Sequence, residues 1–184
     1  MADYRLRQGA YRPDVGAFWR RDPLRRADGN PDVPSAHYEG PHGPLEVYDL
    51  EKLRVTEVRG PGREPIRLEW GPGVDGAQME RLRQGLPFRV AGVDFTLRQP
   101  ARGQRRSSRQ IEVDGGGRRY VARLRSFGRM TVERGDGSAV ARFATARHGG
   151  RGWMDDGVDA VDVAVVVVLE GSGVTQEAIM GSLP

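Results

Sequence analysis

The sequence predicts a mainly β protein built as an antiparallel meander. Short runs of alternating apolar and polar residues follow one another from Leu45 to Phe143, as in strands with one buried face. Turn residues separate these runs, and the 184-residue chain contains 26 glycines and 12 prolines. The combined fraction of glycine and proline is above the average for proteins but below the fraction typical of disordered low-complexity chains. We therefore expect a turn-rich globular domain of roughly eight or more strands.

Residues 1–44 differ from the rest in their dense prolines, which leave no room for a regular element of normal length. We interpret this segment as an extended arm and residues 45–184 as a single β-rich domain. The arm carries aromatic and arginine side chains, which are enriched at protein interfaces. The residues expected to contact a partner are Tyr4, Arg7, Tyr11, Phe18, Trp19, Arg20 and Arg21.

The alternating runs that we predict as strands cover residues 45–48, 53–58, 66–70, 88–97, 111–113, 120–124, 130–133 and 139–143. Within 88–97, the dipeptide Ala91-Gly92 predicts the tight turn of a hairpin. One short helix is expected from about Ala77 to Gln84, because Met79 and Leu82 have helical spacing and Gly85 ends the run.

The last long segment, residues 159–170, is ambiguous. It is rich in valine, which favours a strand. It is also twelve residues long, with Asp159 at its start and Gly171 after it, and these residues are typical helix caps. The residues alone leave helix and strand open.

The hairpin at 88–97, the short hairpins that follow it through Phe143 and the closing segment 157–169 resemble the tubby-like β-barrel group, in particular its LURP-one-related and phospholipid-scramblase-like branch. The resemblance covers roughly residues 86–172. It implies a closed antiparallel barrel around a C-terminal helix at about 159–170 that is apolar on every side. Members of the group generally bind or anchor rather than catalyse, and some are proposed to touch membrane lipids.

Asp162 is the polar exception within this apolar segment. A buried carboxylate needs a partner, and we expect an arginine from the barrel wall. The neighbouring Asp155, Asp156 and Asp159 do not have the spacing of a calcium loop. Aspartates in the first turn of a helix are favoured as caps and by the helix dipole, so we interpret the cluster as structural and expect no metal.

The sequence contains no complete catalytic or cofactor-binding signature. The absence of cysteine excludes disulfides, thiolate metal sites and thiol catalysis. Residues 71–76 match the pattern G-x-G-x-x-G, but Pro72 lacks an N–H donor and no βαβ series follows, which indicates an ordinary turn. The His148-Gly149-Gly150 run is similar to an esterase oxyanion loop, yet the chain has no G-x-S-x-G elbow. We expect neither a catalytic site nor a cofactor.

The formal net charge of +4 conceals one strongly basic stretch, residues 98–129, with 10 arginines against 2 acidic residues. Clustered arginines suit contact with phosphate groups or with an anionic lipid surface. The alternative is that they pair with the chain's own acidic residues. The candidates for anion binding are Arg102, Arg105, Arg106, Arg109, Arg118 and Arg119.

These observations favour a non-catalytic binding or assembly protein that recognises another protein chain through two segments. These are the arm and the arginine-rich loop, by which we mean the segment that contains Arg102, Arg105, Arg106 and Arg109. The alternative function is binding of nucleic acid or anionic lipid through Arg102 to Arg129. The N-terminus lacks the apolar region of a signal peptide, and the longest apolar run, Val163 to Leu169, is shorter than the roughly 18 residues of a membrane span. We therefore expect a cytoplasmic location.

Overall fold

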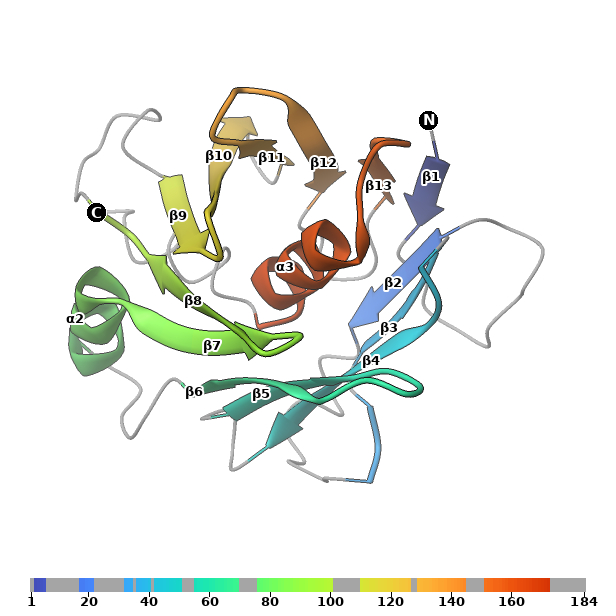
Figure 1. Ribbon diagram of the computed structural model, residues 1–184, viewed down its shortest axis with the longest axis horizontal. Helices are drawn as coiled ribbons and strands as arrows, with labels where there is room; N and C mark the ends of the chain where they lie inside the picture. Colours follow the sequence, from blue (N-terminus) through green and yellow to red (C-terminus); the bar gives the residue numbers. More distant parts are fainter. Residues whose placement is uncertain are drawn as a thin grey trace.

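A computed structural model gives the fold of the chain (Figure 1). It describes residues 2–5, 17–21, 32–34, 36–40, 42–50, 55–69, 76–100, 110–126, 129–144 and 151–172. The described residues form thirteen strands and two helices. The protein is thus mainly β, as the alternating sequence pattern predicts.

Most strands belong to two antiparallel meanders. The first contains β3 (Ala36–Glu39), β4 (Leu45–Leu50), β5 (Val55–Arg59) and β6 (Ile66–Glu69). The second contains β7 (Leu86–Val90), β8 (Val93–Arg98), β9 (Gln110–Gly115), β10 (Arg118–Ser126), β11 (Arg129–Arg134), β12 (Ala139–Ala144) and β13 (Arg151–Met154). Neighbouring strands along the chain are neighbours in space, which is what a meander requires.

Two N-terminal strands join the meanders. β1 (Ala2–Arg5) pairs antiparallel with β13 and parallel with β2 (Ala17–Arg21), and β2 pairs antiparallel with β3. The sequence predicts no regular element of normal length in residues 1–44, and the strands described there are short, with four or five residues each. A strand takes its hydrogen bonds from its neighbours, so four or five residues between two prolines are enough.

The hairpin and the short helix predicted from the sequence are confirmed. β7 and β8 are joined at Val90 and Val93 by the two-residue turn Ala91-Gly92. Both turn residues have positive φ, 49° and 78°, the left-handed backbone that suits the twist of a hairpin. The helix α2 covers Gly76–Gln84, between β6 and β7, and its Leu82 is fully buried.

The C-terminal segment is a helix, α3 (Ala160–Gly171), which resolves the ambiguity of the valine-rich run. Asp159 caps its start, and the strands of both meanders surround it in Figure 1. Each residue from Val163 to Leu169 is at most 2% exposed. Burial on all sides explains why the helix needs no polar face, and packing here overrides the weak helix propensity of valine.

The sheet ends at β6 and β7, which are the outermost strands of its order. These two strands lie side by side, with α3 on their inner side (Figure 1). Within the described strands no ladder of backbone hydrogen bonds joins them, so the sheet is curled but not closed. We call the place where β6 and β7 meet the seam.

Candidate functional site

Two features share the first turn of α3. On one side lies a polar cluster, which we define as Arg118, Tyr120, Arg134, Asp159 and Asp162. On the other side lies an apolar pocket at the seam, which we call the seam pocket. Positions 159 and 162 fall on one side of a helical turn and positions 160, 161 and 164 on another, which is why one short segment serves both features.

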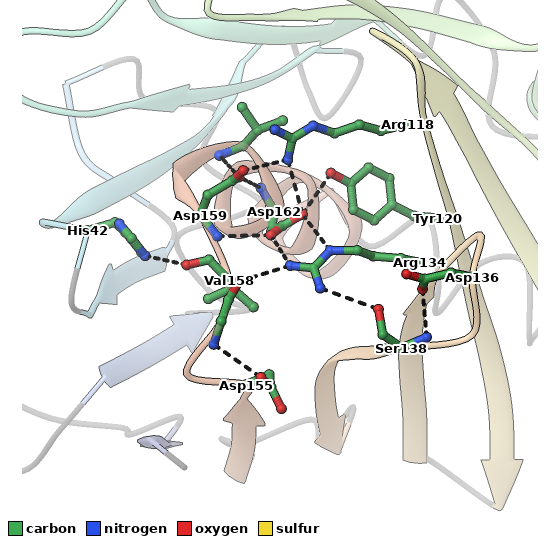
Figure 2. A network of polar contacts seen from close by, with 12 residues as sticks. His42, Arg118, Tyr120, Arg134, Asp136, Ser138, Asp155, Val158, Asp159 and Asp162 are labelled. Atoms are coloured by element: carbon green, nitrogen blue, oxygen red, sulfur yellow. Dashed lines mark hydrogen bonds and ion pairs between the residues drawn. The ribbon is translucent and has the colours of Figure 1, made fainter.

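Asp162 is the centre of the polar cluster (Figure 2). Its side chain is fully buried, and its carboxylate accepts hydrogen bonds from Arg134 Nη2 (2.5 Å), the Tyr120 hydroxyl (2.8 Å) and the Asp159 backbone N–H (2.9 Å). Arg118 Nη1 is 3.4 Å away. The arginine partner expected from the sequence is thus Arg134 of β11. These contacts compensate the cost of burying the charge.

Strand register brings the other members of the polar cluster to Asp162. Tyr120 of β10 and Arg134 of β11 are directly opposite each other, so they share the inner face of the sheet. Burial raises the pKa of Tyr120 to about 12, which keeps its hydroxyl a donor at neutral pH. The hydrogen bond to Asp162 raises the pKa of Arg134 above its ordinary value. Both groups therefore keep the protonation state that Asp162 requires.

Asp159 is the N-cap of α3 and the second acid of the polar cluster. Its carboxylate accepts from the backbone N–H groups of Val161 (2.9 Å) and Asp162 (3.0 Å) and from Arg118 Nη1 (2.7 Å). Burial alone would raise the pKa of Asp159. The hydrogen bonds from the Asp162 backbone and from Arg118 outweigh that effect and lower it below the ordinary value of 3.8.

This lowered pKa predicts a pH dependence of stability. The folded state favours the charged carboxylate, so Asp159 stabilises the protein above pH 3.8 and that contribution is lost as the pH falls through the folded pKa. We expect the wild type to be more stable than Asp159→Asn at pH 7 by up to about 1 kcal/mol, since asparagine is an equally good cap but has no charge. Denaturant unfolding of both proteins from neutral pH to below 3.8 measures the difference. A difference that grows on acidification would contradict this assignment.

The seam pocket has a volume of about 360 Å³. Its walls are mainly apolar side chains of β4 to β7 and α3, namely Leu45, Val58, Ile66, Val90, Val161 and Ala164. The turn between β5 and β6 forms its rim, with Arg63 and Glu64 as the charged groups. In the part of the chain that the structure describes, no serine, threonine, tyrosine, histidine or aspartate lines it. These described lining residues thus provide contact area, one cation and one carboxylate, but no hydroxyl group and no histidine.

The arginines predicted to bind anions divide into two groups. Arg118 belongs to the polar cluster, and Arg119 pairs with Glu112 (3.2 Å) and Asp114 (3.7 Å). These two guanidinium groups are therefore bound by the protein's own carboxylates, the alternative that the sequence left open. Arg102, Arg105, Arg106 and Arg109 lie outside the described residues.

The residues predicted for partner contact are described only as backbone. Tyr4 lies in β1, and Phe18, Trp19, Arg20 and Arg21 lie in β2. Trp19 is in register with the buried Tyr38, and Arg20 with the exposed His37. Arg7 and Tyr11 lie outside the described residues, as do residues 71–75 of the glycine motif and the His148 run.

Sequence reasoning missed the seam pocket. Its signals are weak but present: alanines at 160 and 164 interrupt an otherwise valine-rich helix, and the turn Gly60-Pro61-Gly62 stands opposite them. Small residues leave space where bulkier ones would fill it. The start of α3 and the turn between β5 and β6 come together only because the sheet curls and brings β6 beside β7.

The chain was compared with models of protein families, with curated proteins and with solved structures, and none of the three comparisons gives a match. Among the described residues, no group of three or more histidine, aspartate or glutamate side chains is arranged to hold a metal ion. Neither described helix has the length and apolar character needed to cross a membrane.

Proposed function

We propose that this chain is a non-catalytic binding protein that takes an apolar ligand into the seam pocket. The observation that carries this proposal is the lining of the pocket, which combines apolar walls with a charged rim. Its volume of about 360 Å³ falls within the range of roughly 300–1,000 Å³ found for small-molecule sites. Catalysis is disfavoured because the polar cluster already uses its carboxylates and arginines to hold α3 in place.

The proposal includes a tubby-like barrel whose end strands β6 and β7 meet at the seam around α3 without sharing a hydrogen-bond ladder. Two observations support this arrangement: β6 and β7 lie side by side, and their alternate residues Ile66, Leu68, Leu86 and Phe88 are all buried. The polar cluster fixes the start of α3, which forms one wall of the pocket. A wall held in this way is preorganised, so binding orders few additional groups.

Calorimetric titration with decanol tests this function, because decanol is apolar and uncharged. We expect saturable binding to the wild type. Replacing Ala160 by leucine fills the pocket from α3 and should weaken binding at least about tenfold, which corresponds to about 1.4 kcal/mol. The matched control is Ala139→Leu, at a half-buried alanine in β12 that does not line the pocket. No saturable binding, or equal loss in both variants, would refute the proposal.

We also propose, as a second candidate, that the N-terminal segment mediates assembly with a second copy of this chain. β1 and β2 are short and are joined to their neighbours by long connections, residues 6–16 and 22–35. Strand pairs of this kind can form between copies as well as within one, by exchange of identical elements. Light scattering should then give a molar mass above 20.3 kDa that falls to the monomer value when residues 1–35 are removed. A full-length protein that stays monomeric at all concentrations would exclude this candidate.

Binding of nucleic acid or anionic lipid through the arginine-rich loop has its own test. Contacts with phosphate weaken steeply as the salt concentration rises. Replacing Arg105, Arg106 and Arg109 together by serine should abolish such binding if it occurs. Unchanged affinity for single-stranded DNA and for anionic vesicles would exclude this function.

A further inference from the structure

We infer that the ligand of the seam pocket is a single-chain amphiphile with a carboxylate group, which Arg63 binds at the rim. This inference rests on the proposed function and specifies its ligand. It follows from three features of the rim: the pairing of the surrounding arginines, the way Arg63 is held, and the balance of charge around Glu64.

Arg63 differs from the arginines near it. Arg59 pairs with Glu57 at 2.5 Å, Arg67 with Glu69 at 3.0 Å and Arg89 with Asp94 at 2.7 Å. Within the described chain, Arg63 forms no ion pair, and its guanidinium donates one hydrogen bond, from Nη2 to the backbone carbonyl of His42 (2.6 Å). A guanidinium has five N–H donors, so most of them are available to a ligand.

The position of Arg63 is fixed from two directions. Pro61 and Gly62 form the middle of a turn that the Arg63 N–H closes on the Gly60 carbonyl (3.3 Å), with Gly62 at φ 65°. His42, which accepts from Arg63, also contacts the Val158 carbonyl through Nε2 (2.8 Å), just before the cap of α3 (Figure 2). The cation is thus tied both to its own turn and to the helix that forms a pocket wall.

Glu64 is the second charged residue of the rim and would repel an anion. Its charge acts on Arg89, whose pKa is raised first by the hydrogen bond to Asp94 and then, more weakly, by Glu64. Arg89 is already paired with Asp94 at 2.7 Å, so it does not neutralise Glu64. Removing the Glu64 charge should strengthen binding of an anion.

The chemistry of the ligand follows from this arrangement. Apolar walls suit an alkyl chain, and a single planar guanidinium suits a carboxylate, which it can bind through two parallel hydrogen bonds. A headgroup with several negative charges would face Glu64, and Arg63 is the one cation among the described residues that line the pocket. The ligand that fits these features is a monocarboxylate with an alkyl chain of medium length.

Titration with decanoate and decanol separates the charged group from the chain, because the two share their alkyl length. We expect the wild type to bind decanoate about tenfold more tightly than decanol. Arg63→Gln should lower the decanoate affinity to about that of decanol and should affect decanol binding much less. Glu64→Gln should tighten decanoate binding. Arg67→Gln removes the same charge from an exposed residue of β6 outside the pocket and should change neither affinity.

The possible outcomes distinguish the role of Arg63 from the existence of the apolar site. Equal affinities in the wild type, or no effect of Arg63→Gln on decanoate, would overturn the role of Arg63 while leaving the apolar site intact. An equal loss in Arg67→Gln would overturn it too, because the effect would then reflect only general charge. Failure of both ligands to bind would instead refute the proposed function.

Discussion

Replacement of Asp162 by alanine is expected to destabilise the fold by about 3 kcal/mol, the lower end of the range for breaking a buried ion pair. The variant leaves Arg134 without its carboxylate and the buried Tyr120 hydroxyl without its acceptor. It also removes half of the capping box at the start of α3. The lower end applies because the Arg134 side chain is 31% exposed and can regain some contact with water. Denaturant unfolding measures the loss.

Asp94→Ala is the matched control. Asp94 also forms an ion pair with an arginine, Arg89, but its side chain is 77% exposed. Exposed pairs contribute little to stability, so this variant should unfold almost as the wild type does. Equal stability of Asp162→Ala and Asp94→Ala would show that the polar cluster does not hold α3.

Replacement of any one of the four consecutive residues Val165 to Val168 by aspartate is expected to abolish folding. Four successive residues cover the full circumference of a helix, and each is at most 2% exposed. A buried unpaired charge costs several kcal/mol, an appreciable part of the total stability of a domain. On a helix with one solvated face, at least one of the four positions would tolerate the charge.

The same substitution at Val93 is the control for this scan. Val93 is 39% exposed in the β7–β8 hairpin, and a charge there keeps its contact with water. Soluble expression and circular dichroism should show folded protein for Val93→Asp and none for the four helical variants. A folded variant with aspartate within Val165 to Val168 would contradict the central position of α3.

The antiparallel meander was predictable because each strand with one buried face carries its own alternating signal. β8 shows this most clearly, since its buried Phe95 and Leu97 alternate with exposed Asp94 and Thr96. The short helix α2 and the turn at Ala91 were predictable for the same reason, because helical spacing and turn chemistry are local. Local patterns of this kind do not report which distant strands become neighbours.

The N-terminal strands and α3 depend on such distant neighbours. β1 and β2 form because β13 and β3 offer them backbone partners, and nothing within residues 1–21 records those partners. In the valine-rich run the propensity favours a strand, and the cap at Asp159 favours a helix. Enclosure by the sheet decides between them, and the resemblance to tubby-like barrels pointed to the same outcome.

The candidate site was predictable in only one of its two parts. A buried carboxylate needs a partner, so the sequence predicted an arginine for Asp162 but not the other members of the polar cluster. The seam pocket gave no comparable signal, because its walls come from β4 to β7 and α3 and its rim residue Arg63 looks like any other arginine in the sequence. Among the described residues Arg63 forms no ion pair, unlike Arg59, Arg67 and Arg89 near it, and only the folded arrangement shows this difference.

Mapping of decanol binding by changes in backbone amide chemical shifts tests the seam pocket as a binding site most directly, since it locates the ligand as well as detecting it. A ligand in the seam pocket should give saturable shifts concentrated at Ala91, Ala160 and Val161, around the seam, with little change in β11 and β12. Shifts that do not saturate, or that concentrate away from the seam, would contradict a binding site between β6, β7 and α3.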